Sequence, residues 1–371
     1  MHPIQRVLTL LAALALLGGC ASLPPPPPRP VVNAALERRI DALVHGFDGK
    51  VGVAVEDVRT GAVVAVDGRS FYPQQSVSKL WVALAVLDAA DHGALKLDEP
   101  ILVRREDMSV FNQPIQKKLD DAGYPTTLDD LLGWAISRSD NAADDILMRR
   151  LGGQAAVARV IEAKGLRGLR ASPEEHILES RVAGLEWRPE YSFGQAFWTA
   201  RDKVDPVLRR RLLQAYVDRP EDGATPKGLV RALGRLQRGE LLSPAATAKF
   251  MALLTATETG PLRLKAGLPP GWSIAHKTGT GQDLGDLSTG YNDVGLVTAP
   301  DGQVYAVAVM IAQTRRPIPE RQALMAAVAR AVAEAHETPL KEGLTHLRRP
   351  RPCATAVRFT LGPSRRLVAL G

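Results

Sequence analysis

Hydrophobic positions repeat first with the period of a helix and then with the period of a strand. Residues 33–45 place apolar side chains at helical spacing after Asn33, which suits a helix N-cap, and predict a helix. Residues 52–57 and 62–66 are short valine-rich runs, separated by the turn residues Thr60 and Gly61. These two runs predict a β-hairpin.

The pattern becomes helical at residue 76 and stays so through the middle of the chain. A long apolar run covers residues 76–90 and predicts a helix. Further helices are predicted at residues 128–137, 142–151, 155–164, 206–217, 227–237 and 244–255. Strand signals return at residues 273–280, 294–297 and 304–312, with Asp301 and Gly302 as a hairpin turn, before a last helix at 319–337.

This order of elements predicts an α+β fold with two lobes. Residues 33–72 and 260–337, from the two ends of the body, can complete one mixed antiparallel sheet flanked by helices. Residues 73–259 then form an all-helical lobe. No internal repeat or linker divides residues 33–337. We expect the functional site in the cleft between the lobes.

Composition and charge change this picture only slightly. The 371 residues are 45% hydrophobic and 23% charged, which is typical of a globular protein. The formal net charge is +7, but residues 338–371 contain seven Lys or Arg and one Glu, so they carry +6 of it. A basic end can favour membrane or nucleic-acid contact. We interpret this one as a solvated, disordered tail and expect no nucleic-acid partner.

The two cysteines, Cys20 and Cys353, are far apart in the sequence. They provide neither metal-ligand spacing nor a disulfide framework, so we expect no metal and no other cofactor.

Residues 1–20 have the pattern of a secretory signal: Arg6, an apolar run from Val7 to Leu17, and then small residues. The run is shorter than the roughly 20 residues of a membrane-spanning helix. It ends in Gly18-Gly19-Cys20, which resembles the bacterial lipobox and implies lipidation of Cys20. The alternative is an ordinary signal peptide with a chance cysteine.

Residues 21–32 follow as a proline-rich tether, with five consecutive prolines at 24–28 that favour an extended chain. We therefore expect a periplasmic protein anchored by lipid, with Ala21 favouring the outer membrane.

Three short motifs carry the candidate chemistry: Ser-Val-Ser-Lys at 76–79, Ser-Asp-Asn at 139–141 and Lys-Thr-Gly at 277–279. Ser76 lies where a loop becomes a helix, so free backbone N–H groups can stabilise negative charge near its hydroxyl. Lys79 lies one turn further on the same face and can accept the serine proton if it is kept neutral. The simpler interpretation is a capping serine and a solvated lysine.

The Ser-Asp-Asn motif lies between two predicted helices. Ser139 could pass a proton to a leaving nitrogen, and Asn141 could bind an amide on the acyl side of a substrate. Taken alone, the motif is better explained as a helix N-cap.

The Lys-Thr-Gly motif lies on a predicted edge strand. Lys277 supplies a positive charge for a substrate carboxylate, and Gly279 lets a ligand approach the backbone. The N–H groups of Thr280 and Ser76 are candidate donors to an oxyanion.

All three motifs in this order resemble the class A β-lactamases, a family of penicillin-recognising serine hydrolases. The resemblance runs from about residue 36 to residue 335, and includes residues 71–72, 93–98, 131–136, 260–263, 268–272 and 292–297. It implies the two-lobe fold and a serine nucleophile at Ser76, with Thr278 among the substrate-binding residues. It also implies that Arg263 supports carboxylate binding and that Phe111 flanks the site entrance.

The family also uses a loop glutamate that activates the water for deacylation. Glu175 stands 36 residues after Ser139 and matches this position, with Glu174 as its rival. Two solvated loop acids are the simpler interpretation.

The sequence departs from the family pattern around this glutamate. Glu179 replaces the asparagine that helps to hold the water, Pro173 replaces an arginine, and Asp145 replaces an asparagine that supports the loop. Residues 181–223 form a longer, aromatic-rich segment that could be a flap over the cleft or could simply cover the glutamate loop. Residues 282–289 lengthen the following hairpin.

We therefore expect a monomeric serine hydrolase that opens β-lactam rings through an acyl-enzyme on Ser76. Two alternatives stay open. One is a penicillin-binding, peptidase-like enzyme that acts on peptidoglycan peptides. The other is a lipoprotein that binds wall fragments without hydrolysing them.

Overall fold

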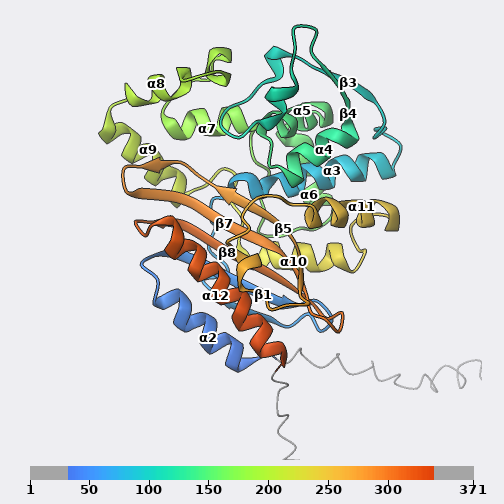
Figure 1. The fold of residues 1–371 in the computed structure, drawn as a ribbon, viewed down its shortest axis with the longest axis vertical. Helices are drawn as coiled ribbons and strands as arrows, with labels where there is room; N and C mark the ends of the chain where they lie inside the picture. Colours follow the sequence, from blue (N-terminus) through green and yellow to red (C-terminus); the bar gives the residue numbers. More distant parts are fainter. Residues whose placement is uncertain (1–31, 338–371) are drawn as a thin grey trace, which may run out of the picture.

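The computed structural model describes residues 32–337. They form two lobes: a sheet with its covering helices, and a helical lobe (Figure 1). The predicted signal segment, all but the last residue of the tether and the basic tail lie outside the described residues. Within residues 32–337 no helix is both long and apolar enough to cross a bilayer.

The main sheet is antiparallel throughout, with strand order β2-β1-β8-β7-β5 and the short β6 paired with β7. Its strands are β1 (Gly49–Asp57), β2 (Val63–Val66), β5 (Ser273–Thr280), β6 (Asp283–Leu284), β7 (Leu287–Thr298) and β8 (Val304–Thr314). The first hairpin therefore joins β5, β7 and β8 in one sheet, as the hydrophobic pattern predicts. Strand β5, which carries the Lys-Thr-Gly motif, lies at an edge of the sheet.

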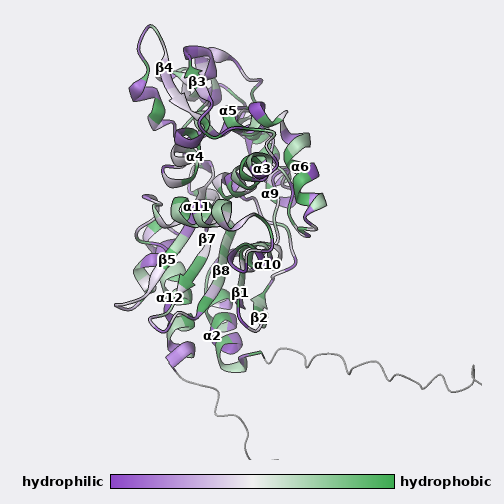
Figure 2. Cartoon of the chain, turned by 90° about the vertical axis from the view of Figure 1, so that its right-hand side faces the viewer, coloured by the Kyte–Doolittle hydropathy of each residue, from purple (hydrophilic) through white to green (hydrophobic). Residues whose placement is uncertain are grey.

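Both faces of the sheet are buried, because side chains alternate between two cores along each strand. Val53 and Val55 of β1 face one hydrophobic core, whereas Ala54 faces the other. Helices α2 (Ala34–His45) and α12 (Ile318–Glu337) cover the first face. Helix α10 (Pro226–Gln237) packs against β1 and β8 on the second face, on the side of the helical lobe (Figure 2).

The helical lobe surrounds α3 (Lys79–Asp91), whose first nine residues are all buried. Its other helices are α4 (Leu128–Ser137), α5 (Asn141–Leu151), α6 (Gln154–Ala163), α7 (Glu175–Ala183), α8 (Ala196–Asp202), α9 (Pro206–Asp218) and α11 (Pro244–Thr255). Helices α4, α5, α6 and α11 all contact α3. The described α+β architecture confirms the predicted fold class.

Several elements differ from the sequence-based expectation. The chain before α3 forms a short 3-10 helix, η2 (Gln75–Ser78), rather than the first turn of one long helix. The helical lobe also carries a small hairpin of β3 (Pro100–Val103) and β4 (Tyr124–Thr127), at its end far from the main sheet (Figure 2). Helices α7 and α8 were not predicted.

Candidate active site

Ser76 lies in η2 at the junction of the two lobes, half-buried between fully buried neighbours. The preceding residue, Gln75, has a φ of 54°, a left-handed conformation that costs a non-glycine residue on the order of 1 kcal/mol or more. Two residues hold it there: Asp222 Oδ2 accepts from the Gln75 N–H at 2.7 Å, and Tyr216 Oη lies 2.8 Å from Gln75 Nε2. This strained turn directly precedes Ser76, whose hydroxyl lies against the buried Lys79 ammonium.

Lys79 is completely buried, and its ammonium contacts three side chains. Its Nζ lies 2.8 Å from Ser76 Oγ, 3.0 Å from Asn141 Oδ1 and 2.5 Å from Glu175 Oε1. Burial alone would lower the pKa of Lys79, but the carboxylates of Glu175 and Asp144 raise it above its usual value. Lys79 therefore rests as a cation paired with Glu175, and it can accept the serine proton only after passing one to that carboxylate.

Glu175 is the first residue of α7, not a loop residue as the sequence suggested. Its side chain is buried, and its backbone N–H donates to Asp145 Oδ1 at 2.6 Å. Of the two rival acids, only Glu175 contacts Lys79. Glu174 pairs with Arg149 at 3.2 Å.

Ser139 and Lys277 meet across the cleft from opposite lobes. Lys277 Nζ donates to Ser139 Oγ at 2.7 Å and to the carbonyl of Thr278 at 3.0 Å. Burial, and then the charge of Lys79, hold the pKa of Lys277 well below its usual range. Ser139 itself has a φ of 58°, which marks a second strained residue at the site. This pair can deliver a proton to a group between the lobes.

Asn141 joins the two halves of the site through its side-chain amide. Its Oδ1 accepts from Lys79, while its Nδ2 donates to the carbonyl of Val110 at 2.9 Å. The predicted contact with a substrate amide would have to share this side chain with Lys79 and Val110.

Strand β5 packs directly against η2, which brings the Lys-Thr-Gly motif beside Ser76. A Cβ on Gly279 would lie 2.4 Å from the carbonyl oxygen of Gln74, so only glycine fits there. The neighbouring Thr278 shares a hydrogen bond of 2.7 Å with Thr259.

Arg263 is buried behind β5 rather than open to the cleft. It donates to the carbonyls of Gly279 and Asn292 at 3.0 and 2.6 Å, and to Thr280 Oγ1 at 2.7 Å. Arg263 therefore fixes the end of β5 and orients Thr280, through which it can support carboxylate binding.

A family model described as the beta-lactamase enzyme family matches residues 35–336, most of the chain. The chain belongs to the class A β-lactamase family. A β-lactamase of Bacteroides uniformis is 29% identical over 81% of this chain and 90% of its own length. The extended-spectrum β-lactamase PER-1 of Pseudomonas aeruginosa is also 29% identical, over 79% and 85%. A solved class A β-lactamase representing the last common ancestor of Gram-negative bacteria (GNCA4) is 30% identical, covers 82% of this chain with all of its own, and has a TM-score of 0.64.

Glu179 is the most consequential departure from the class A β-lactamase pattern. It is buried one turn along α7 from Glu175, and Gln282 Nε2 donates to its Oε2 at 2.7 Å and to its backbone carbonyl at 2.9 Å. Burial, and then the charge of Glu175, raise the pKa of Glu179 to about 8. At neutral pH Glu179 is thus a neutral carboxylic acid, which, like an amide, can both donate and accept a hydrogen bond.

We expect this protonation to appear in the pH profile. Below about pH 8 the Glu179 carboxyl keeps its proton; above it, a second negative charge lies one turn along α7 from Glu175, the proposed base for deacylation. The deacylation rate should therefore fall about tenfold per pH unit above roughly pH 8 in the native protein. Glu179→Gln cannot ionise, so its deacylation rate should not fall above pH 8. The same fall in the variant as in the native protein would contradict the role of Glu179 ionisation. Single-turnover decay of the acyl-enzyme from pH 6 to 10 measures it.

Asp145 compensates for the asparagine that the family pattern expects. Its carboxylate accepts from the N–H groups of Glu175 and His176 at the start of α7, from Ser109 Oγ at 2.7 Å and from His176 Nδ1 at 2.8 Å. A carboxylate is favourable at a helix N-terminus. Asp145, Glu174 and His176 lie close enough to approach one metal ion, but these donors and Arg149 already engage the two carboxylates.

The inserted segment forms a flap beside the site, as one of the two sequence-based interpretations expected. Helices α7, α8 and α9 lie together on one side of the helical lobe (Figure 1), and residues of α8 pack on Phe111. A cleft of about 710 Å³ lies between α8, the Phe111 loop and the end of β5. No sequence pattern pointed to Gln75, Tyr216, Asp222 or Gln282, because their roles depend on contacts between distant segments.

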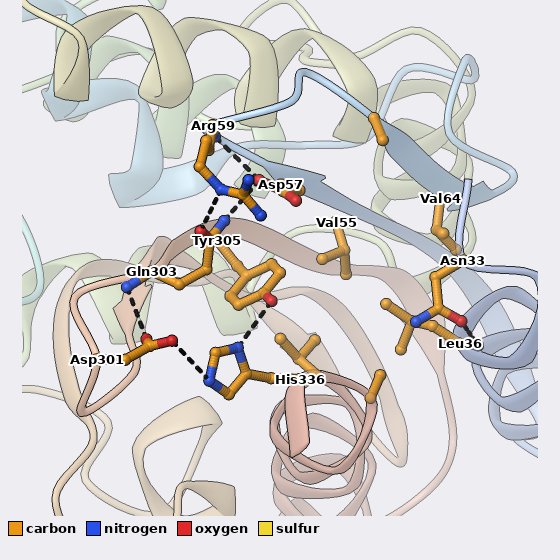
Figure 3. A pocket seen from close by; sticks show the side chains of 13 residues that line it. Asn33, Leu36, Val55, Asp57, Arg59, Val64, Asp301, Gln303, Tyr305 and His336 are labelled. Carbon is orange, nitrogen blue, oxygen red and sulfur yellow. Dashed lines mark hydrogen bonds and ion pairs between the residues drawn. The ribbon is translucent and has the colours of Figure 1, made fainter. Parts of the chain in front are cut away.

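A second cavity, of about 300 Å³, lies between α2, α12 and the sheet (Figure 3). Its polar groups bind one another: Arg59 donates to Gln303, Gln303 donates to Asp57, and Tyr305 lies 3.0 Å from His336. We therefore assign the chemistry to the site around Ser76 and Lys79.

Proposed function

We propose that the chain hydrolyses β-lactams through an acyl-enzyme on Ser76, with Glu175 as the base for deacylation. The observation that carries this proposal is the buried Lys79 ammonium, which touches the predicted nucleophile, the predicted base and Asn141 within 3.0 Å. The family to which the chain belongs supports the reaction class.

Acylation begins when Lys79 passes a proton to Glu175 and accepts the proton of the Ser76 hydroxyl. Ser76 Oγ attacks the lactam carbonyl carbon, and the N–H groups of Ser76 and Thr280 stabilise the oxyanion. The C–N bond of the ring then breaks. Ser139 protonates the leaving nitrogen, and Lys277 then reprotonates Ser139. The lowered pKa of Lys277 makes its ammonium a stronger acid and therefore a better proton donor.

Deacylation uses Glu175, Lys79 and Ser76 again, but the proton now returns to the Ser76 oxygen. Acylation leaves Glu175 protonated and Lys277 short of one proton, so Glu175 first loses its proton to solvent and Lys277 takes one up from solvent. The restored Glu175 carboxylate then removes a proton from a water, whose oxygen attacks the ester carbon. The ester bond to Ser76 Oγ breaks, and the proton returns to that oxygen through Lys79.

Time-resolved intact-protein mass spectrometry with a penicillin tests the proposal, together with turnover of a chromogenic cephalosporin. We expect a transient adduct of one penicillin on Ser76 and steady release of hydrolysed product. A long-lived adduct without turnover would instead indicate a penicillin-binding, peptidase-like enzyme. The absence of any adduct would indicate a binding protein.

We also propose that the mature protein is a periplasmic monomer, held at the outer membrane by a lipid on Cys20. The Gly18-Gly19-Cys20 sequence and the proline run after it support this proposal. Detergent extraction and mass measurement would reveal the lipid. Release of Cys20→Ala protein in soluble form would support the anchor, and unchanged membrane retention would contradict it.

A further inference from the structure

We infer that the cleft between α8 and the end of β5 is a subsite for an acyl side chain that carries both an aromatic ring and a carboxylate. This inference rests on the proposed function and names the substrate class that the same site would prefer.

The position of the cleft follows from the order of residues along β5. Lys277, the predicted partner of the lactam carboxylate, comes first, and Thr280, the candidate oxyanion donor, comes three residues later. The cleft begins at Thr280 and continues along residues 281–283. A substrate whose carboxylate lies at Lys277 and whose carbonyl lies at Thr280 therefore extends its acyl side chain into this cleft.

The wall opposite β5 is aromatic and comes from the inserted segment and from Phe111. Phe111 packs edge-on against Phe197 with ring centroids 4.9 Å apart, and it lies 5.1 Å from Trp198. Phe197 is buried and anchors the group, whereas Trp198 is 37% exposed. An exposed indole beside a fixed aromatic cluster is a suitable surface for a planar ring.

Arg201 adds a positive charge to this wall. Its side chain is only 16% exposed, its guanidinium lies 4.3 Å from the centroid of the Trp198 ring, and its buried Nε has no hydrogen-bond partner among the described residues. Its acidic neighbour, Asp202, is 3.7 Å away and 68% exposed, so the pair is weak.

One acidic residue, Asp283, also lines the cleft, but it is exposed to solvent. A guanidinium that lines the cleft and is only weakly paired can recognise a carboxylate through directed hydrogen bonds, which a solvated lysine would not provide. The combination of a ring surface and a weakly paired guanidinium therefore selects an anionic aromatic side chain.

The test compares benzylpenicillin with α-carboxybenzylpenicillin, which differ only in a carboxylate on the acyl side chain. The readout is the ratio of kcat/KM for the carboxylated compound to that for benzylpenicillin. Arg201→Gln should lower this ratio about tenfold, since it removes a hydrogen bond to a charged group. Arg201→Lys should lower the ratio less than Arg201→Gln does, because lysine keeps the positive charge but lacks the planar guanidinium that can donate two parallel hydrogen bonds.

Arg211→Gln is the matched control, because Arg211 belongs to the same insertion and is exposed outside the cleft. It should leave the ratio unchanged. The inference is overturned if Arg201→Gln leaves the ratio unchanged, or if Arg211→Gln lowers it equally.

Failure of the proposed function would be recognised separately, as the absence of turnover for both penicillins. The ratio is then taken from dissociation constants of the two compounds on Ser76→Ala protein, with and without Arg201→Gln, and the same outcomes support or overturn the subsite.

Discussion

Replacing Glu175 by glutamine should slow deacylation by roughly a thousandfold, within the range of 10²–10⁴ typical of general bases. The glutamine side chain keeps the size of the glutamate but cannot accept a proton from the water. Acylation should suffer less, because the variant removes the charge that does most to raise the pKa of Lys79, and the ammonium then gives up its proton more easily. The variant should accumulate one covalent penicillin on Ser76, visible as a stable mass shift.

Glu174→Gln is the control for this experiment. Glu174 is adjacent in sequence but pairs with Arg149 instead of Lys79, so its replacement should leave the acyl-enzyme lifetime close to that of the native protein. If Glu175→Gln left the lifetime unchanged, the peptidase-like alternative would gain support, since such an enzyme needs no dedicated glutamate. If Glu174→Gln produced the stable adduct, the assignment of the base would be wrong.

The parts of the fold that the sequence predicted are those whose pattern reflects one dominant environment. Strand β5 was predicted with its observed bounds, because its apolar residues lie between turn-forming segments. Helix α4 was predicted equally well from its apolar pattern, and the structure adds Thr127 as its N-cap. Helix α7 was missed because its buried residues include Glu175, Glu179 and Ser180, so polar side chains stand where a hydrophobic face would identify a helix.

The candidate site likewise contains residues that the sequence predicted and residues that it did not. Short motifs mark Ser76, Lys79, Ser139 and Lys277, because proton transfer requires fixed spacing along a helix or strand. The residues that hold these motifs in place come from elsewhere. Asp222 and Tyr216 support the strained turn before Ser76, and Gln282 reaches Glu179 from a hairpin more than 100 residues away along the chain. No local sequence pattern predicts such contacts, because they form only when the two lobes pack together.

The neutral state of Glu179 shows why a departure from the family pattern need not abolish the chemistry. A charged glutamate in place of asparagine would compete with Glu175 for the same water. Burial and the neighbouring charge instead keep the Glu179 carboxyl protonated below about pH 8. From the sequence alone, Glu175 and Glu179 are two acids that would repel each other when both are charged. The structure shows that Glu179 is buried, which keeps it neutral.

Replacing Lys79 by methionine should reduce acylation by roughly 10³-fold or more, because the proton of the Ser76 hydroxyl then has no acceptor within reach. Methionine fills much of the same volume, so the loss would reflect the ammonium rather than a cavity. The variant should also be less stable. Lys79 and Glu175 are both buried, and removing one partner of a buried ion pair costs about 3–5 kcal/mol. We expect the Tm to fall by on the order of 10 °C.

The double variant Lys79→Met with Glu175→Gln separates the two effects. It removes both charges, so it should regain most of the stability that Lys79→Met loses, while acylation stays as slow as in the single variant. Chemical denaturation gives the free energy of unfolding of the four proteins, and the rate of adduct formation gives acylation. A double variant no more stable than Lys79→Met would show that Lys79 contributes through its contacts with Ser76 and Asn141 rather than through the ion pair. Normal acylation in Lys79→Met would mean that Glu175 alone takes the serine proton, through a water in place of the ammonium.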